Sequence, residues 1–226
     1  MTANKTSIIA VATLVAVGLG YWAYGSHQKR ETQQMTVALI ADIADRLRQS
    51  LIAEAASPPA SRTRRMSTLD DEAAVADKGL KTLKAMHASG NQPLVDAADD
   101  YLITSREILK KLADVNRYRA RLDNSSQALL EHMRSRSRSG AWVQDAVQAR
   151  ERVNQDLRAY TTAAEVSGKL LESFAASQKR IAPFVGKETL IAEDIVAKAS
   201  ARVAKNLQQT TAEMEKTKLP EGFRQR

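Results

Sequence analysis

The chain has 226 residues, of which 43% are hydrophobic but only 4% are aromatic, and it carries a formal net charge of +8. It has no cysteine, which excludes a disulfide framework and a thiolate metal site. The shortage of aromatic residues argues against a strand-rich fold, and the abundance of Ala, Leu, Glu, Lys, Arg and Gln predicts an all-α protein. The positive charge favours anionic partners.

Residues 7–24 contain no charged side chain, although charged residues make up 27% of the whole chain. As a helix, the 21 residues between Lys5 and His27 would span about 30 Å, the thickness of the hydrocarbon core of a bilayer. Three aromatic residues near the end of this segment are typical of a membrane interface: Tyr21, Trp22 and Tyr24. The sequence therefore predicts a transmembrane anchor over residues 1–26.

A cleavable export signal is the alternative to this anchor, because residues 8–19 are apolar and Ala23-Tyr24-Gly25 has the small-x-small pattern of a cleavage site. The positive-inside rule hardly decides the orientation, since Lys5 precedes the segment while Lys29 and Arg30 follow it. Short N-terminal anchors in bacteria mostly export the chain that follows them. The soluble part is therefore expected on the periplasmic side of a bacterial inner membrane.

Beyond the anchor, apolar residues recur at intervals of three and four, which predicts amphipathic helices separated by Pro, Gly and Ser breaks. A juxtamembrane helix is expected over residues 27–56, because Pro58-Pro59 must end it. A linker is expected over residues 57–69. A short second helix should follow, with Thr68 as its N-cap and acidic residues 70–72 near the positive end of its dipole.

The third and fourth helices have the longest repeats, over residues 94–133 and 143–181, where seam residues alternate at spacings of four and three. A short Gly-containing turn joins them, so they form a coiled-coil hairpin about 60 Å long. Their seams include Arg119 and Arg150, so other helices or a second copy must cover the hairpin. With a fifth helix over residues 192–214, an elongated antiparallel bundle is expected over residues 70–219, followed by a frayed basic tail over 220–226.

No catalytic or metal-binding set can be assembled from the sequence. Two Gly-Lys pairs lack the flanking residues of a phosphate-binding loop. Glu131 and His132 are adjacent and point to different faces, whereas di-iron bundles use Glu-x-x-His on one face. Asp96, Asp99 and Asp100 lie at the start of a helix, where they favour its dipole. We therefore expect no enzyme activity, cofactor or metal.

Up-down connectivity places the turns after the first, third and fifth helices far from the bilayer. These turns are basic, which predicts contacts with an anionic partner at the distal end through Arg62, Arg64, Arg65, Arg134, Arg136 and Arg138. The end of the fifth helix and the tail add Lys216, Lys218, Arg224 and Arg226. The alternative is that each cluster only favours the negative end of its own helix.

Three functions are consistent with this organisation. The leading hypothesis is a single-pass membrane protein whose rod acts as a scaffold, spacer or accessory subunit of a membrane or envelope complex, through a protein partner or a second copy. The arrangement also resembles, as architecture only, the extracytoplasmic four-helix sensor domains of bacterial chemoreceptors and histidine kinases, which implies ligand binding and signalling through a partner chain. A cytoplasm-facing coiled coil that engages division proteins or nucleic acid is the third. The basic clusters lack aromatic or base-reading neighbours, so no nucleic acid is expected.

Overall fold

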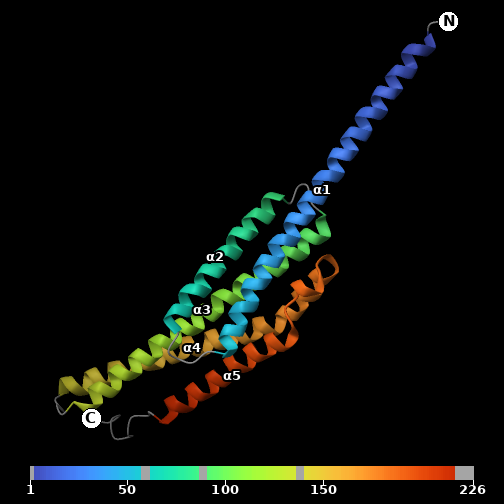
Figure 1. The fold of residues 1–226 in the computed structure, drawn as a ribbon. Coiled ribbons are helices and arrows are strands. Elements are labelled where there is room, and N and C mark those ends of the chain that lie inside the picture. Colours follow the sequence, from blue (N-terminus) through green and yellow to red (C-terminus); the bar gives the residue numbers. More distant parts are fainter. Residues whose placement is uncertain (1–2, 57–61, 87–90, 136–139, 217–226) are drawn as a thin grey trace.

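A computed structural model describes the backbone of residues 3–56, 62–86, 91–135 and 140–216, and the side chains of residues 29–56, 65–86, 91–135 and 140–215. Within these ranges the chain forms five α-helices and two short 3₁₀ turns (Figure 1). The helices are α1 (Ala3–Ala56), α2 (Arg62–Met86), α3 (Gln92–Arg134), α4 (Gly140–Ile181) and α5 (Glu193–Lys216), and the turns are η2 (Ala182–Phe184) and η3 (Lys187–Thr189). The predicted all-α bundle is confirmed. The predicted tail over residues 220–226 lies outside the described residues.

The antiparallel hairpin of α3 and α4 is the centre of the fold. Its predicted seams are buried over most of their length, and the rings of Tyr101 and Phe174 pack with centroids 5.4 Å apart. Near the far end of the hairpin, Leu129 and Ala146 remain buried, but the seam residue Val143 is 36% exposed. Fewer helices cover the hairpin there. Heptad spacing therefore identified the contact face, and the cover from neighbouring helices determines how deeply each position is buried.

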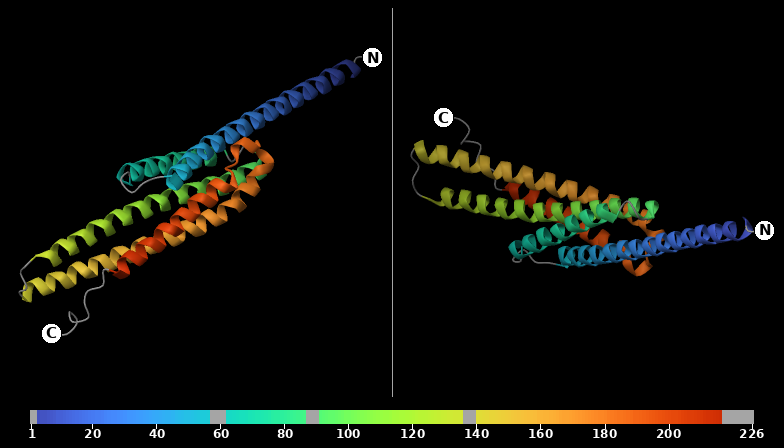
Figure 2. Two further views of the ribbon diagram at one scale, coloured as in Figure 1. Left: turned by 60° about the horizontal axis from the view of Figure 1, so that its bottom comes forward. Right: turned by 90° about the horizontal axis from the view of Figure 1, so that it is seen from above.

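Helix α1 is a single helix whose second half packs into the bundle. The predicted stripe on this half is fully buried: Thr36, Ile40, Ile43, Leu47 and Leu51. The first half projects beyond the other helices, away from the end where α3 and α4 are joined (Figures 1 and 2). Within the residues whose side chains are described, no helix is both long enough and apolar enough to cross a membrane. Residues 7–24, with Tyr21, Trp22 and Tyr24, lie on the part of α1 whose side chains are outside the described residues.

Helix α2 begins earlier than the sequence predicted. It starts at Arg62, so the expected linker over residues 57–69 is wrong for residues 62–69, and Thr68 is not an N-cap. Residues 62–68 contain no Pro or Gly, and burial of Leu69 and Ala73 stabilises the helix that runs through them. The acidic residues 70–72 consequently lie inside the helix. There Asp70 pairs with Arg117 of α3 at 2.9 Å and Glu72 pairs with Arg46 of α1 at 2.8 Å.

The segment between α4 and α5 is held by two polar side chains. Gln178 of α4 brackets Ile191, with its Nε2 donating to the Ile191 carbonyl at 3.1 Å and its Oε1 accepting from the Ile191 amide at 2.6 Å. Arg48 of α1 donates to the carbonyls of Glu188 and Leu190 at 2.7 and 3.3 Å. The segment near Pro183 that interrupts the helices is therefore held against both α1 and α4.

The helices end at different levels along the hairpin. Glu54, near the end of α1, contacts Asn116, which lies near the middle of α3. Met214, near the last described residue of α5, contacts Ser126, further along α3. Beyond that level, within the described residues, α3 and α4 pack against each other alone. This stagger leaves a section where α3, α4 and α5 continue after α1 has ended.

Candidate functional site

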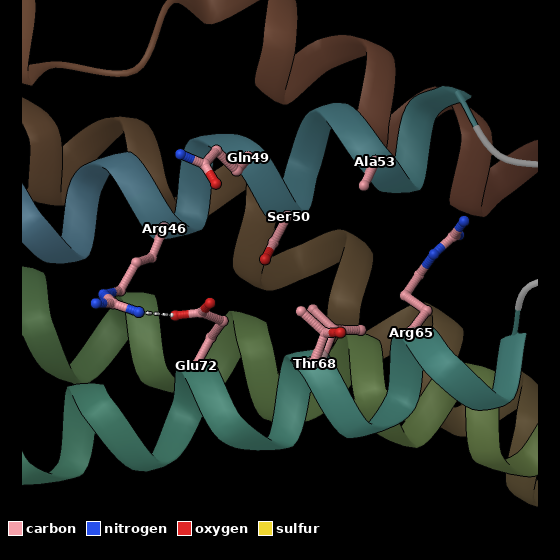
Figure 3. Close-up of a pocket in the computed structure, with 8 residues that line it drawn as sticks. Arg46, Gln49, Ser50, Ala53, Arg65, Thr68 and Glu72 are labelled. Atoms are coloured by element: carbon pink, nitrogen blue, oxygen red, sulfur yellow. Dashed lines mark hydrogen bonds and ion pairs between the residues drawn. The ribbon is translucent and has the colours of Figure 1, made fainter.

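Two concave sites flank the end of α1. The first, which we call the α1–α2 groove, has a volume of about 420 Å³ and lies between these two antiparallel helices (Figure 3). It is lined by Arg46, Gln49, Ser50, Ala53, Arg65, Thr68, Leu69 and Glu72. Figure 3 shows that the small side chains of Ser50 and Thr68 face the space between the helices. Small residues at these facing positions leave the gap unfilled, which is why the groove forms.

An ion pair bridges the two helices at one end of the α1–α2 groove. Arg46 Nη1 lies 2.8 Å from Glu72 Oε2 of α2, and its Nε lies 3.0 Å from Asp42 on α1. The hydrogen bonds to Glu72 and Asp42 raise the pKa of Arg46 above its ordinary value, despite an opposing contribution from burial. The Arg46 guanidinium is therefore permanently charged and already neutralised by two carboxylates.

At the other end, Arg65 separates the groove from a second cavity. Its Nη1 lies 3.1 Å from Glu54 Oε2, and the two side chains are only 12% and 4% exposed. Asn116 of α3 also donates from Nδ2 to Glu54 Oε2, at 3.3 Å. Arg65 lines the α1–α2 groove, whereas Glu54 lines the second cavity. One buried ion pair thus forms part of the wall between the two sites.

The second cavity, which we call the polar chamber, has a volume of about 150 Å³ and lies among α1, α3, α4 and α5. It is lined by Glu54, Val115, Asn116, Arg119, Tyr160, Arg202, Asn206, Gln209, Thr210 and Glu213. The chamber follows from the stagger of the helices, because α1 ends at Ala56 while the other three continue. Bundle interiors of this kind are a common location for small-molecule sites.

Arg119 of α3 lines the polar chamber and has three neighbours around it. Its Nε lies 2.9 Å from Asp123 and its Nη2 lies 3.3 Å from Glu213 of α5. Its guanidinium carbon lies 5.8 Å from the ring centroid of Tyr160, within the range of a cation–π contact. Arg119 occupies a seam position that is poorly suited to a dry two-helix core. The structure shows that it borders a polar cavity instead.

The chamber has a buried inner end and an exposed rim. Thr210 is fully buried, and Tyr160, Glu54 and Asn116 are 1%, 4% and 5% exposed. At the rim, the side chain of Glu213 is 59% exposed. A buried carboxylate therefore lies at one end and an arginine held by an exposed carboxylate at the other.

The structure distributes the predicted anion contacts over different levels of the rod. Arg65 is bound to Glu54 inside the bundle. Arg134 is exposed at the end of α3. The side chains of Arg62 and Arg64, on the first turn of α2, and all of Arg136 and Arg138 lie outside the described residues, as do Lys218, Arg224, Arg226 and the Lys216 side chain. The end of α1 lies beside the middle of α3, because Glu54 contacts Asn116, whereas Arg134 lies at the end of α3.

The sequence did not point to Glu54, Asn116 or Glu213. One signal was available for Glu54, because it follows the buried Leu51 by three residues and so continues the apolar stripe of α1. A carboxylate at such a position must be paired or lie beside a cavity. Asn116 and Glu213 gave no comparable signal, since their role depends on the relative register of α1, α3 and α5.

Within the described residues, no three His, Cys, Asp or Glu side chains gather as they would to hold a metal ion. No family model, curated protein sequence or solved structure matches the chain. Function therefore has to be inferred from the residues and geometry described above.

Proposed function

We propose that the protein is a single-pass membrane protein whose helical bundle acts as a rigid spacer or scaffold for a protein partner, on the periplasmic side of a bacterial inner membrane. The observation that carries this proposal is the continuity of α1, which is one helix from Ala3 to Ala56. The uncharged residues 7–24 and the buried stripe that includes Ile40 and Leu47 therefore belong to a single rod.

A continuous helix transmits position and direction between the two parts that it joins. The 54 residues of α1 correspond to a length of about 80 Å. The contacts of Arg48 with Glu188 and Leu190 tie α1 to the segment between α4 and α5. If the first half of α1 is embedded in a bilayer, the bundle has a fixed distance and orientation relative to it. A spacer needs this property, and a flexible linker would not provide it.

A sensor-like ligand-binding bundle is the second candidate function. It is favoured by the polar chamber, because a cavity lined by buried polar and charged residues in a bundle is suited to a ligand. A binding event beside the end of α1 would act on the same helix that joins the bundle to the proposed anchor. Output would require a partner chain.

The anchor is tested with charged substitutions in the full chain. We expect the wild type to stay in the membrane fraction after carbonate extraction, and Leu14→Arg/Val17→Arg to lose this behaviour, since each arginine at a helix centre costs about 3 kcal/mol of insertion free energy. Gln34→Arg/Met35→Arg is the matched control, because both positions are exposed on the second half of α1. A mature N-terminus after Gly25, found by mass spectrometry, would contradict a retained anchor.

The side of the membrane is tested by fusions after Arg226. We expect alkaline phosphatase to be active and a cytoplasmic fluorescent protein to be dark when each is fused there. The spacer role is tested by inserting Gly-Ser-Gly-Ser after Arg30, which interrupts α1 outside its buried stripe. Membrane localisation should persist, while crosslinks from the bundle to its partner should be lost. Unchanged crosslinks would show that the rigidity of α1 is irrelevant.

A further inference from the structure

The polar chamber offers an unused acceptor at its buried end. Arg65 and Asn116 both donate to Oε2 of Glu54. Within the described residues, Oε1 of Glu54 accepts no hydrogen bond, although the side chain is only 4% exposed. Glu54 lines the chamber, so its Oε1 is open to a hydrogen bond from water or from a ligand there. A group with several N–H donors, such as an ammonium, fits this position.

Toward the rim, the chamber offers donors. Nε and Nη2 of Arg119 bind Asp123 and Glu213, which leaves Nη1 without an acceptor among the described residues. The lining also includes Arg202 and the amides of Asn206 and Gln209 on α5. Guanidinium and amide groups together are suited to a carboxylate. The contact between Arg119 and Glu213 shows that a carboxylate does bind at this point.

The two ends lie close together and their charges balance. Asn116, which binds Glu54, precedes Arg119 by three residues, so the two levels differ by about one helical turn, or about 4.5 Å. The chamber is lined by two arginines and two glutamates, whose formal charges cancel. A ligand with a net charge would leave that charge uncompensated in a largely buried cavity, whereas a ligand with one charge of each sign would not.

We infer that the polar chamber binds a small zwitterion, an amino acid with a short side chain, with its ammonium on Glu54 and its carboxylate on Arg119 and Arg202. The volume of about 150 Å³ admits such a molecule but excludes larger ligands such as nucleotides, peptides and oligosaccharides. This inference rests on the second candidate function, ligand binding by the bundle, and is independent of the membrane anchor.

In this arrangement the carboxylate of Glu213 competes with the carboxylate of the ligand for the guanidinium of Arg119. Its side chain is 59% exposed and its contact with Arg119, at 3.3 Å, is longer than the 2.9 Å contact between Arg119 and Asp123. The carboxylate of the ligand would replace Glu213 on the guanidinium of Arg119. Because Glu54 is on α1, Arg119 on α3 and Arg202 on α5, binding would exchange the direct contact between Glu213 and Arg119 for a ligand that bridges all three helices.

The ligand class is tested by ligand-observed NMR titrations of the purified full chain with L-alanine, propionate and ethylamine. Propionate lacks the ammonium of alanine and ethylamine lacks its carboxylate, so the three compounds separate the two ends of the site. We expect L-alanine to bind at least tenfold more tightly than either of the others. Equal binding of propionate or ethylamine would overturn the zwitterion but leave a ligand-binding bundle, whereas no saturable binding of any compound would overturn both.

Variants locate the binding to the chamber. Arg119→Gln should weaken L-alanine binding at least tenfold, and Arg121→Gln is the matched control, because Arg121 is an exposed arginine on the same helix. Glu213→Gln should tighten binding several-fold by removing the competitor. If Glu213→Gln weakens binding or leaves it unchanged, the assigned position of the carboxylate is wrong. A fold defect in Arg119→Gln would not produce the opposite change in Glu213→Gln, so the pair keeps the inference testable.

Discussion

Arg65 of α2 and Glu54 of α1 form an ion pair of 3.1 Å in which both side chains are almost completely removed from solvent. The pair connects the two helices that line the α1–α2 groove. Replacing one partner leaves a buried charge uncompensated, which costs more than the pair itself contributes.

Arg65→Met should therefore lower the free energy of unfolding by about 3–5 kcal/mol, measured by urea denaturation. The double variant Arg65→Met/Glu54→Met should recover most of this loss, because no charge remains buried. If the double variant is as unstable as the single one, the pair is not the cause of the loss.

Two helical glycines differ in the space around them. A Cβ built on Gly168 of α4 meets nothing within 4 Å, so Gly168→Ala should stabilise the fold by about 1 kcal/mol through helix propensity. A Cβ on Gly79 of α2 would lie 3.0 Å from Cδ1 of Leu39 on α1, so Gly79→Ala should gain less. Thermal unfolding of the two variants checks the order. An equal gain would show that the Leu39 side chain moves aside without cost.

The attachment of α2 to α3 should weaken in acid. Burial alone would raise the pKa of Asp77, but hydrogen bonds from Lys110 and Arg106 outweigh it and lower the pKa below its ordinary value of 3.8. A carboxyl with a lowered pKa in the folded state contributes stability above pH 3.8, and this contribution is lost as the pH falls through the lowered value.

Asp77→Asn should therefore reduce stability at neutral pH, and the difference from the wild type should shrink as the pH falls below about 4. The measurement is the urea midpoint as a function of pH. Asp71→Asn is the control, because Asp71 is exposed and forms no ion pair among the described residues. A difference that is independent of pH would rule out the ionised carboxylate as the cause.

The end of the α3–α4 hairpin depends on Trp142. Its ring stacks on that of His132 with centroids 5.0 Å apart, and its Nε1 donates to Ser135 Oγ at 2.7 Å. Trp142→Ala should remove about 3 kcal/mol of local stability. Hydrogen exchange should rise beyond Ser126, where α3 and α4 pack alone, while the base of the hairpin stays protected. A uniform rise along both helices would show that the hairpin unfolds as one unit.

The sequence was sufficient to predict which residues of α3 and α4 meet, because heptad spacing fixes the contact face of a helix regardless of its neighbours. Leu94, Ile108, Leu122 and Leu129 are buried as that spacing requires. The start of α2 was mispredicted because Thr68 and the acidic residues after it resemble a helix start, although they lie inside a helix stabilised from Leu69 onward.

The polar chamber could not be predicted, because it depends on where α1 ends relative to α3. No local pattern encodes this register, which the contact between Glu54 and Asn116 reveals. The expectation that the basic turns share one end treated successive helices as equal in reach, whereas α2 has 25 residues and α3 has 43. Most residues of those turns lie outside the described part of the chain, so this expectation stays a prediction.

The staggered helix ends also give the rod a taper. Its cross-section is thickest where α1 and α2 lie on α3, thinner after Asn116, and reduced to a pair of helices after Ser126 in the described part of the chain. Bending compliance should rise in the same order. A force applied at the far end would therefore bend the paired helices first. The ion pair between Arg65 and Glu54 would be among the last contacts to be strained.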